Sequence, residues 1–61
     1  MIPIGTRVRI RREAWERVYP HKPWITSAFT IYVIGTHSPF EGMYQLSWPL
    51  HWWKEEDLEV V

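Results

Sequence analysis

Gly5-Thr6-Arg7-Val8-Arg9-Ile10 and Trp53-Lys54-Glu55-Glu56-Asp57-Leu58-Glu59-Val60-Val61 are the two stretches that decide the fold. The first is a glycine turn followed by alternating charged and apolar residues, which is the pattern of a half-buried strand. The second is an aromatic strand end, an acidic turn and a short segment rich in β-branched residues, which favour strands. We therefore predict that the two ends of the chain pair in one sheet.

Three segments between these ends are expected to form further strands. Residues 29–36 are mostly β-branched and aromatic, residues 43–48 alternate until Pro49 interrupts them, and residues 50–53 lead into the last turn. With the strands at the two ends, this makes five.

The segment after the first strand changes period. Residues 13–19 place apolar side chains on one helical face, but Pro20 stops anything helical, so we expect one helical turn or a compact loop. Five short strands with one long first loop fit a small barrel better than a sandwich. The prediction is an all-β fold, with residues 1–61 forming a single five-stranded barrel domain.

Aromatic residues must supply much of the core. A domain of 61 residues buries only about 60% of the surface that its unfolded chain exposes, and this chain has no cysteine to staple it. Five Trp, three Tyr and two Phe can compensate, because each buries roughly 150–250 Å². The side chains in the inward phase of the strands are expected to be buried: Val8, Ile10, Phe29, Ile31, Tyr44, Leu46, Trp53 and Leu58.

Two adjacent tryptophans are expected to lie on opposite faces of a strand. The spacing to Leu58 places Trp53 in the core and Trp52 outside. Trp52 and Trp48 are then candidates for an exposed aromatic patch, which in a small protein usually marks an interface.

Charge is unevenly placed along the chain. Residues 1–36 hold six basic and two acidic side chains, a net of +4, and residues 37–61 hold one basic and five acidic, a net of −4. The resulting zero total weakens long-range attraction to nucleic acid but leaves room for a local basic patch. No segment reads as a signal peptide, and the longest apolar run is too short to span a bilayer, so we expect a soluble cytoplasmic protein without membrane contact.

Five motifs follow one another along the chain: Gly5-Thr6-Arg7-Val8-Arg9-Ile10, Trp15 with Tyr19, Trp24 with Phe29-Thr30-Ile31, Tyr44-Gln45-Leu46 and Trp53-Lys54-Glu55-Glu56-Asp57-Leu58. Their order resembles the small SH3-like or chromo-like module at the C-terminal end of LTR-retrotransposon integrases, and the ending also resembles tiny phage and bacterial SH3-like proteins. The resemblance implies an SH3-like barrel, a binding role and an origin in a phage, plasmid or other mobile element.

Two groups of candidate site residues each have two interpretations. Alternation puts the arginines of the first strand on one face, where they either track phosphates or form an ordinary solvated row paired with acidic neighbours. The aromatic residues of the first loop form either a groove for an extended peptide or part of the core. The resemblance favours the core for Tyr19 and Trp24 and leaves Trp15 open.

The remaining polar residues carry no recognisable catalytic or metal-binding motif. The three histidines lack the spacing of metal ligands, and the acidic run at residues 55–57 reads as a solvated turn. We therefore expect a non-catalytic module, with no cofactor or metal, that binds a protein partner. The alternative is a nucleic-acid-binding module that uses the basic strand face. The expected contact residues are Arg7, Arg9, Arg11, Trp15, Trp48 and Trp52.

Overall fold

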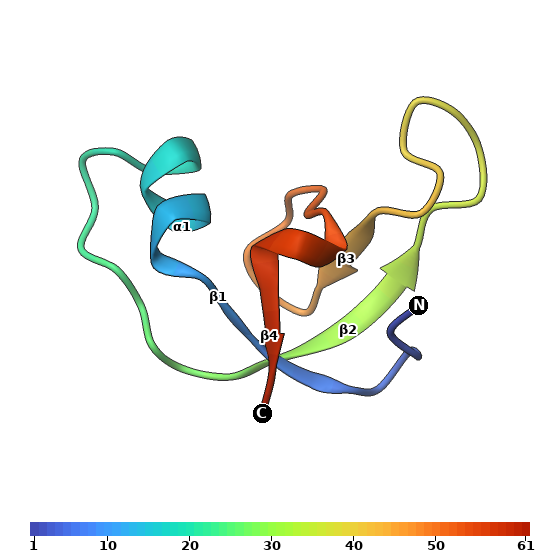
Figure 1. Ribbon diagram of the computed structural model, residues 1–61, viewed down its shortest axis with the longest axis horizontal. Helices are drawn as coiled ribbons and strands as arrows, with labels where there is room; N and C mark the ends of the chain where they lie inside the picture. Colours follow the sequence, from blue (N-terminus) through green and yellow to red (C-terminus); the bar gives the residue numbers. More distant parts are fainter.

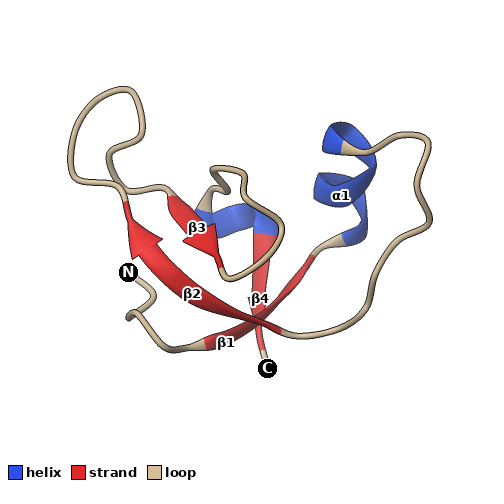
Figure 2. Ribbon diagram, turned by 180° about the vertical axis from the view of Figure 1, so that it is seen from behind, coloured by secondary structure: helices blue, strands red, loops and turns tan.

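Four antiparallel strands form one open sheet in the order β3-β2-β1-β4, with a short helix packed beside it (Figures 1 and 2). The computed structural model describes all residues from 1 to 61. None of its helices is long and apolar enough to cross a membrane. The elements are β1 (Arg7–Ile10), α1 (Arg12–Val18), β2 (Phe29–Ile34), β3 (Tyr44–Leu46), a 3₁₀ turn η1 (Glu55–Asp57) and β4 (Leu58–Val60).

The predicted pairing of the two chain ends is confirmed. Strands β1 and β4 are antiparallel, and Arg9 lies opposite Glu59 while Ile10 lies opposite Leu58. Because the side chains of opposed residues share a face, this register puts Ile10 and Leu58 together on the core side. The other edge of β1 pairs with β2, which makes β1 a central strand.

The prediction of a five-stranded SH3-like barrel is wrong, because the sheet has four strands and does not close. Residues 50–53 do not form the expected strand. Of these, Trp53 alone bridges to Tyr44, through two backbone hydrogen bonds of 2.8 Å each. Pro49 immediately before this segment has no N–H to give to a ladder, and the chain bends around it instead of extending. The outer strands β3 and β4 are therefore left as separate edges.

The predicted core is confirmed at all but one position. Seven of the eight residues named from strand phase are at most 4% exposed, and Phe29 is half-buried against them. Trp53 is fully buried, which confirms the phase assigned to the Trp52–Trp53 pair. Ile2, Ala14 and Trp15 join the same cluster from outside the sheet.

Helix α1 is longer than the single turn that the sequence predicted. Its seven residues make about two turns, since an α-helix has 3.6 residues per turn. Ala14 and Trp15 bury one face, and an i,i+4 contact of 3.1 Å joins Arg12 to Glu16 on the exposed side. Burial of the Trp15 indole stabilises the helix, because helices of this length are unstable without tertiary packing. Pro20 follows its end, as expected.

Candidate functional site

The arginine row of β1 is largely used to hold the chain together. Arg9 donates from Nε to the carbonyl of Thr26 at 2.7 Å, and its Nη1 lies 3.7 Å from a carboxylate oxygen of Glu59. Arg7 donates to the carbonyl of Ala28 at 3.3 Å. Two of the three arginines thus strap the long loop between α1 and β2 onto the sheet. Arg11 is exposed and makes neither a side-chain hydrogen bond nor an ion pair.

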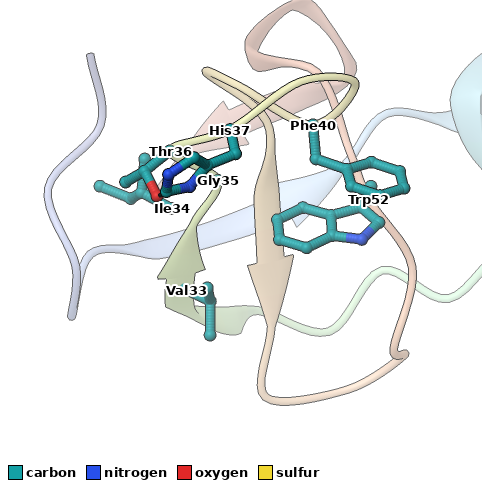
Figure 3. A pocket seen from close by; sticks show the side chains of 7 residues that line it. All are labelled: Val33, Ile34, Gly35, Thr36, His37, Phe40 and Trp52. Carbon is teal, nitrogen blue, oxygen red and sulfur yellow. Dashed lines mark hydrogen bonds between the residues drawn. The ribbon is translucent and has the colours of Figure 1, made fainter.

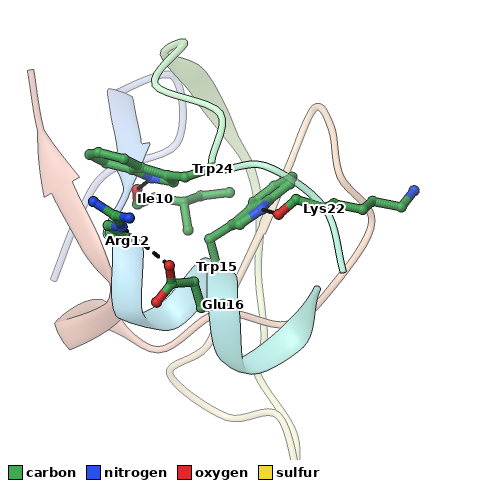
Figure 4. Close-up of polar contacts among 6 residues, drawn as sticks. All are labelled: Ile10, Arg12, Trp15, Glu16, Lys22 and Trp24. Carbon is green, nitrogen blue, oxygen red and sulfur yellow. Dashed lines mark hydrogen bonds and ion pairs between the residues drawn. The ribbon is translucent and has the colours of Figure 1, made fainter. Parts of the chain in front are cut away.

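Trp15 belongs to the core. Its side chain is 1% exposed, and its indole N–H donates to the carbonyl of Lys22 at 3.2 Å (Figure 4). Of its two interpretations, burial supports the structural one, so the expectation that Trp15 itself contacts a partner does not fit its position. The adjoining ring of Tyr19, 4.6 Å away between centroids, is half-buried.

Trp24 lies at the surface, so the prediction of a core position for it is wrong. Its ring is 37% exposed, and its indole N–H donates to the carbonyl of Ile10 at 2.9 Å (Figure 4). The guanidinium of Arg12 lies 6.0 Å from the ring centroid. This tryptophan covers the end of β1, where the sheet gives way to α1.

Trp48 is the most exposed tryptophan, at 51%, and two other rings support it. The ring of Phe29 lies 5.7 Å away and that of buried Trp15 lies 6.4 Å away, both tilted by about 45°. We call Tyr19, Phe29 and Trp48 the aromatic patch: the buried ring of Trp15 contacts Tyr19 and Trp48, and Trp48 contacts Phe29. It lies on the core side of the sheet, since Phe29 pairs with buried Val8 in the register of β1 and β2.

Trp52 belongs to a different ring cluster. It stacks on Phe40 with centroids 4.8 Å apart and planes only 13° apart, whereas Trp48 contacts Trp15 and Phe29. Trp52 and Phe40 form one side of a hollow of about 240 Å³ under the β2–β3 loop, with His37 and Val33 on its other sides (Figure 3). The structure therefore divides the two tryptophans of the expected patch between two places.

The expected contact residues thus do not share one surface: Trp15 is in the core, and the others are divided. Arg7 and Arg9 share a face of β1 that is opposite to the core, Trp48 lies on the core side, and Trp52 lines the hollow. The patch residues Tyr19 and Phe29 were not among the predicted site residues. Only their aromatic character and their position in and beside the first loop could have indicated a surface role. Both features are equally compatible with a position in the core.

One carboxylate of the acidic turn is structural, which corrects the expectation of a solvated run. Asp57 is 7% exposed; its Oδ1 accepts from Nη2 of Arg17 at 2.9 Å and its Oδ2 accepts from the backbone N–H of Lys54 at 3.1 Å. The hydrogen bond and the negative charge of Asp57 raise the pKa of Arg17 above its ordinary value. This pair ties α1 to the turn before β4.

The side chains do not assemble a metal-binding constellation: no group of three or more His, Asp and Glu residues lies close enough together. Comparison with known proteins gives no family model, no curated protein and no solved structure that matches the chain. The resemblance to integrase modules therefore stays a hypothesis that rests on the motifs alone.

Proposed function

We propose that this protein is a non-catalytic module that binds another protein through the aromatic patch. The observation that carries the proposal is the state of Trp48, half of whose surface faces solvent while its ring rests on Phe29 and Trp15. A large ring already held in place loses little conformational entropy on binding, which is why rigid Trp side chains so often dominate binding energies. Leu50, at 75% exposure, adds apolar surface two residues further along the chain.

The nucleic-acid alternative has weaker support. Arg7 and Arg9 already donate to carbonyl oxygens, and Glu59 beside Arg9 places a negative charge where a phosphate would lie. Of the three, only Arg11 has a side chain that makes neither a hydrogen bond nor an ion pair. A phosphate-tracking surface needs several such free cations, because each neutralised phosphate adds to affinity by releasing counterions.

We also propose that the protein is cytoplasmic, because a chain without cysteine suits a reducing compartment.

The test is an affinity purification with three baits: the parent chain, Trp48→Ala and the control Tyr32→Ala. Tyr32 is 68% exposed and no other ring contacts it, so the control removes an aromatic side chain of comparable exposure from another place. Proteins recovered by both the parent and the control are then measured by calorimetry against all three baits, whether or not Trp48→Ala recovers them. We expect Trp48→Ala to weaken binding by at least about 30-fold, which corresponds to roughly 2 kcal/mol.

Circular dichroism of each bait checks that it is folded, and Trp48→Phe serves if Trp48→Ala is not. A partner that binds folded Trp48→Ala and Trp48→Phe as tightly as the parent would refute the proposal. A partner whose binding falls steeply with salt and depends on Arg11 would favour the basic face instead.

A further inference from the structure

A single unpaired cation lies at the border of the aromatic patch. The ammonium nitrogen of Lys22 is 5.8 Å from the ring centroid of Tyr19, the patch residue nearest to α1. None of the four ion pairs in the molecule includes Lys22. No carboxylate of the chain therefore neutralises its charge.

The backbone at this cation is held from two directions. The carbonyl of Lys22 accepts the indole N–H of buried Trp15, and its N–H donates to the carbonyl of Tyr19 at 3.1 Å. Figure 4 shows the side chain of Lys22 running away from the indole of Trp15. The backbone that carries the ammonium group is thus fixed at one edge of the patch.

We propose that the aromatic patch docks a protein segment in which an apolar or aromatic anchor is followed or preceded by a carboxylate. The anchor covers Trp48 and Phe29, and the carboxylate pairs with Lys22. Charge complementarity selects this occupant: a basic segment would place like charges together at the border of the patch, which costs binding energy and slows association. This inference rests on the proposed function and adds the chemistry of the partner to it.

The proposal is tested without knowing the natural partner. A displayed library of random 12-residue peptides is selected on the purified full chain, and the peptides that bind are measured by calorimetry against the parent, Lys22→Glu, Arg11→Glu and Trp48→Ala. Arg11→Glu is the matched control, since it reverses another exposed and unpaired charge, at the N-terminal end of α1, whereas Lys22 follows the C-terminal end. Lys22→Glu changes an exposed side chain, so folding is retained and circular dichroism verifies it.

We expect the selected peptides to carry Asp or Glu beside a Leu, Ile or aromatic residue. Their binding should weaken at least about 5-fold in Lys22→Glu and remain unchanged in Arg11→Glu. The loss in Lys22→Glu should shrink between about 0.05 and 0.5 M NaCl, because added salt screens exposed charges.

Three other results would overturn the inference. Peptides that need Trp48 but show no acidic preference and no effect of Lys22→Glu would refute the carboxylate and leave the proposed function standing. A set of peptides that bind folded Trp48→Ala normally, or no binders at all, would count against both. A parent chain that sediments as a dimer and a Trp48→Ala variant that sediments as a monomer would identify a second copy as the occupant of the patch.

Discussion

At the scale of single residues, backbone crowding and the placement of one ring decide the local structure. Gly35 follows β2 at the start of the β2–β3 loop, and two hydrogen bonds join it to the end of that loop. Its N–H donates to the carbonyl of Met43 at 2.8 Å, and its own carbonyl accepts from the N–H of Gly42 at 3.0 Å. A Cβ added at this position would collide with the carbonyl oxygen of Phe40. Because that oxygen belongs to the backbone, the loop and not a flexible side chain would have to move.

Gly35→Ala should therefore lower the free energy of unfolding by about 1–3 kcal/mol, the usual cost of forcing extra atoms into an occupied space. It should also disturb the stack of Phe40 on Trp52, which near-ultraviolet circular dichroism reports. Glu41→Ala, an exposed change in the same loop, is the control and should leave both the stability and the spectrum unchanged. A Gly35→Ala variant as stable as the parent would show that the loop relaxes freely.

At the scale of elements, a carboxylate connects the helix to the last strand. Asp57 closes the 3₁₀ turn by accepting from the backbone of Lys54, and it also reaches Arg17 of α1. Asp57→Ala should lower the free energy of unfolding by about 1–3 kcal/mol, because it leaves the backbone N–H of Lys54 and the guanidinium of Arg17 without their acceptor. Thermal unfolding measures this, with Glu56→Ala as the exposed neighbour that should have little effect.

The pKa shift of Arg17 gives the pH dependence of the same contact. Folding raises that pKa, so the arginine's contribution is complete at every pH below its ordinary value and is lost only as the pH rises through the folded value. Arg17 stays charged between pH 6 and 9, so its titration should cause no change in the stability difference between the parent and Arg17→Ala over that range. That difference should be small, because water screens a side chain that is 61% exposed.

The same scale shows how far sequence patterns reach. Period-two alternation located β1 and β3, because a half-buried strand leaves that pattern directly, and β-branched and aromatic composition located β2. The spacing to Leu58 gave the burial of Trp53. The strand prediction failed at residues 50–53. Their composition suits a strand, but the chain bends around Pro49. Whether a segment pairs into a sheet also depends on a strand that is distant in the sequence, and this leaves no local pattern. The second turn of α1 was missed because the burial of Trp15 supplies its stability.

The candidate site was predictable only in part. Trp48 was expected in an exposed patch with Trp52, but alternation along residues 43–48 puts it on the same face as buried Tyr44 and Leu46, so strand phase did not predict its exposure. Its contact with Phe29 joins residues from two distant segments. The partners of Arg7 and Arg9 are backbone carbonyls of a loop, which have no sequence signature at all. Whether Trp15 is buried or exposed also depends on contacts with distant segments, so the sequence alone does not predict it.

At the scale of the whole molecule, an open sheet still gives a compact body. The radius of gyration is 10.9 Å, close to the value of about 10.5 Å expected for a folded chain of 61 residues. The net charge is zero, so long-range attraction of polyanions to this body is weak. Random duplex DNA or single-stranded RNA should bind with a dissociation constant no tighter than about 10⁻⁵ M at physiological salt.

Fluorescence titration of labelled oligonucleotides, repeated at several salt concentrations, measures this affinity. Submicromolar binding with a steep salt dependence, abolished in the triple variant Arg7→Ala, Arg9→Ala, Arg11→Ala, would contradict the prediction and make nucleic-acid binding the leading function. Arg11→Ala alone is the informative control, because it removes a cation without releasing the long loop.

The straps from β1 to the long loop carry a consequence for variation. Arg7 and Arg9 grip the main-chain oxygens of Ala28 and Thr26, and every amino acid offers that same oxygen. The loop can therefore exchange the side chains at residues 26–28 while its path over the sheet stays fixed. Mutation, in nature or in a laboratory library, can therefore change the side chains of Thr26 and Ser27, which are exposed, without removing the hydrogen bonds that hold the loop.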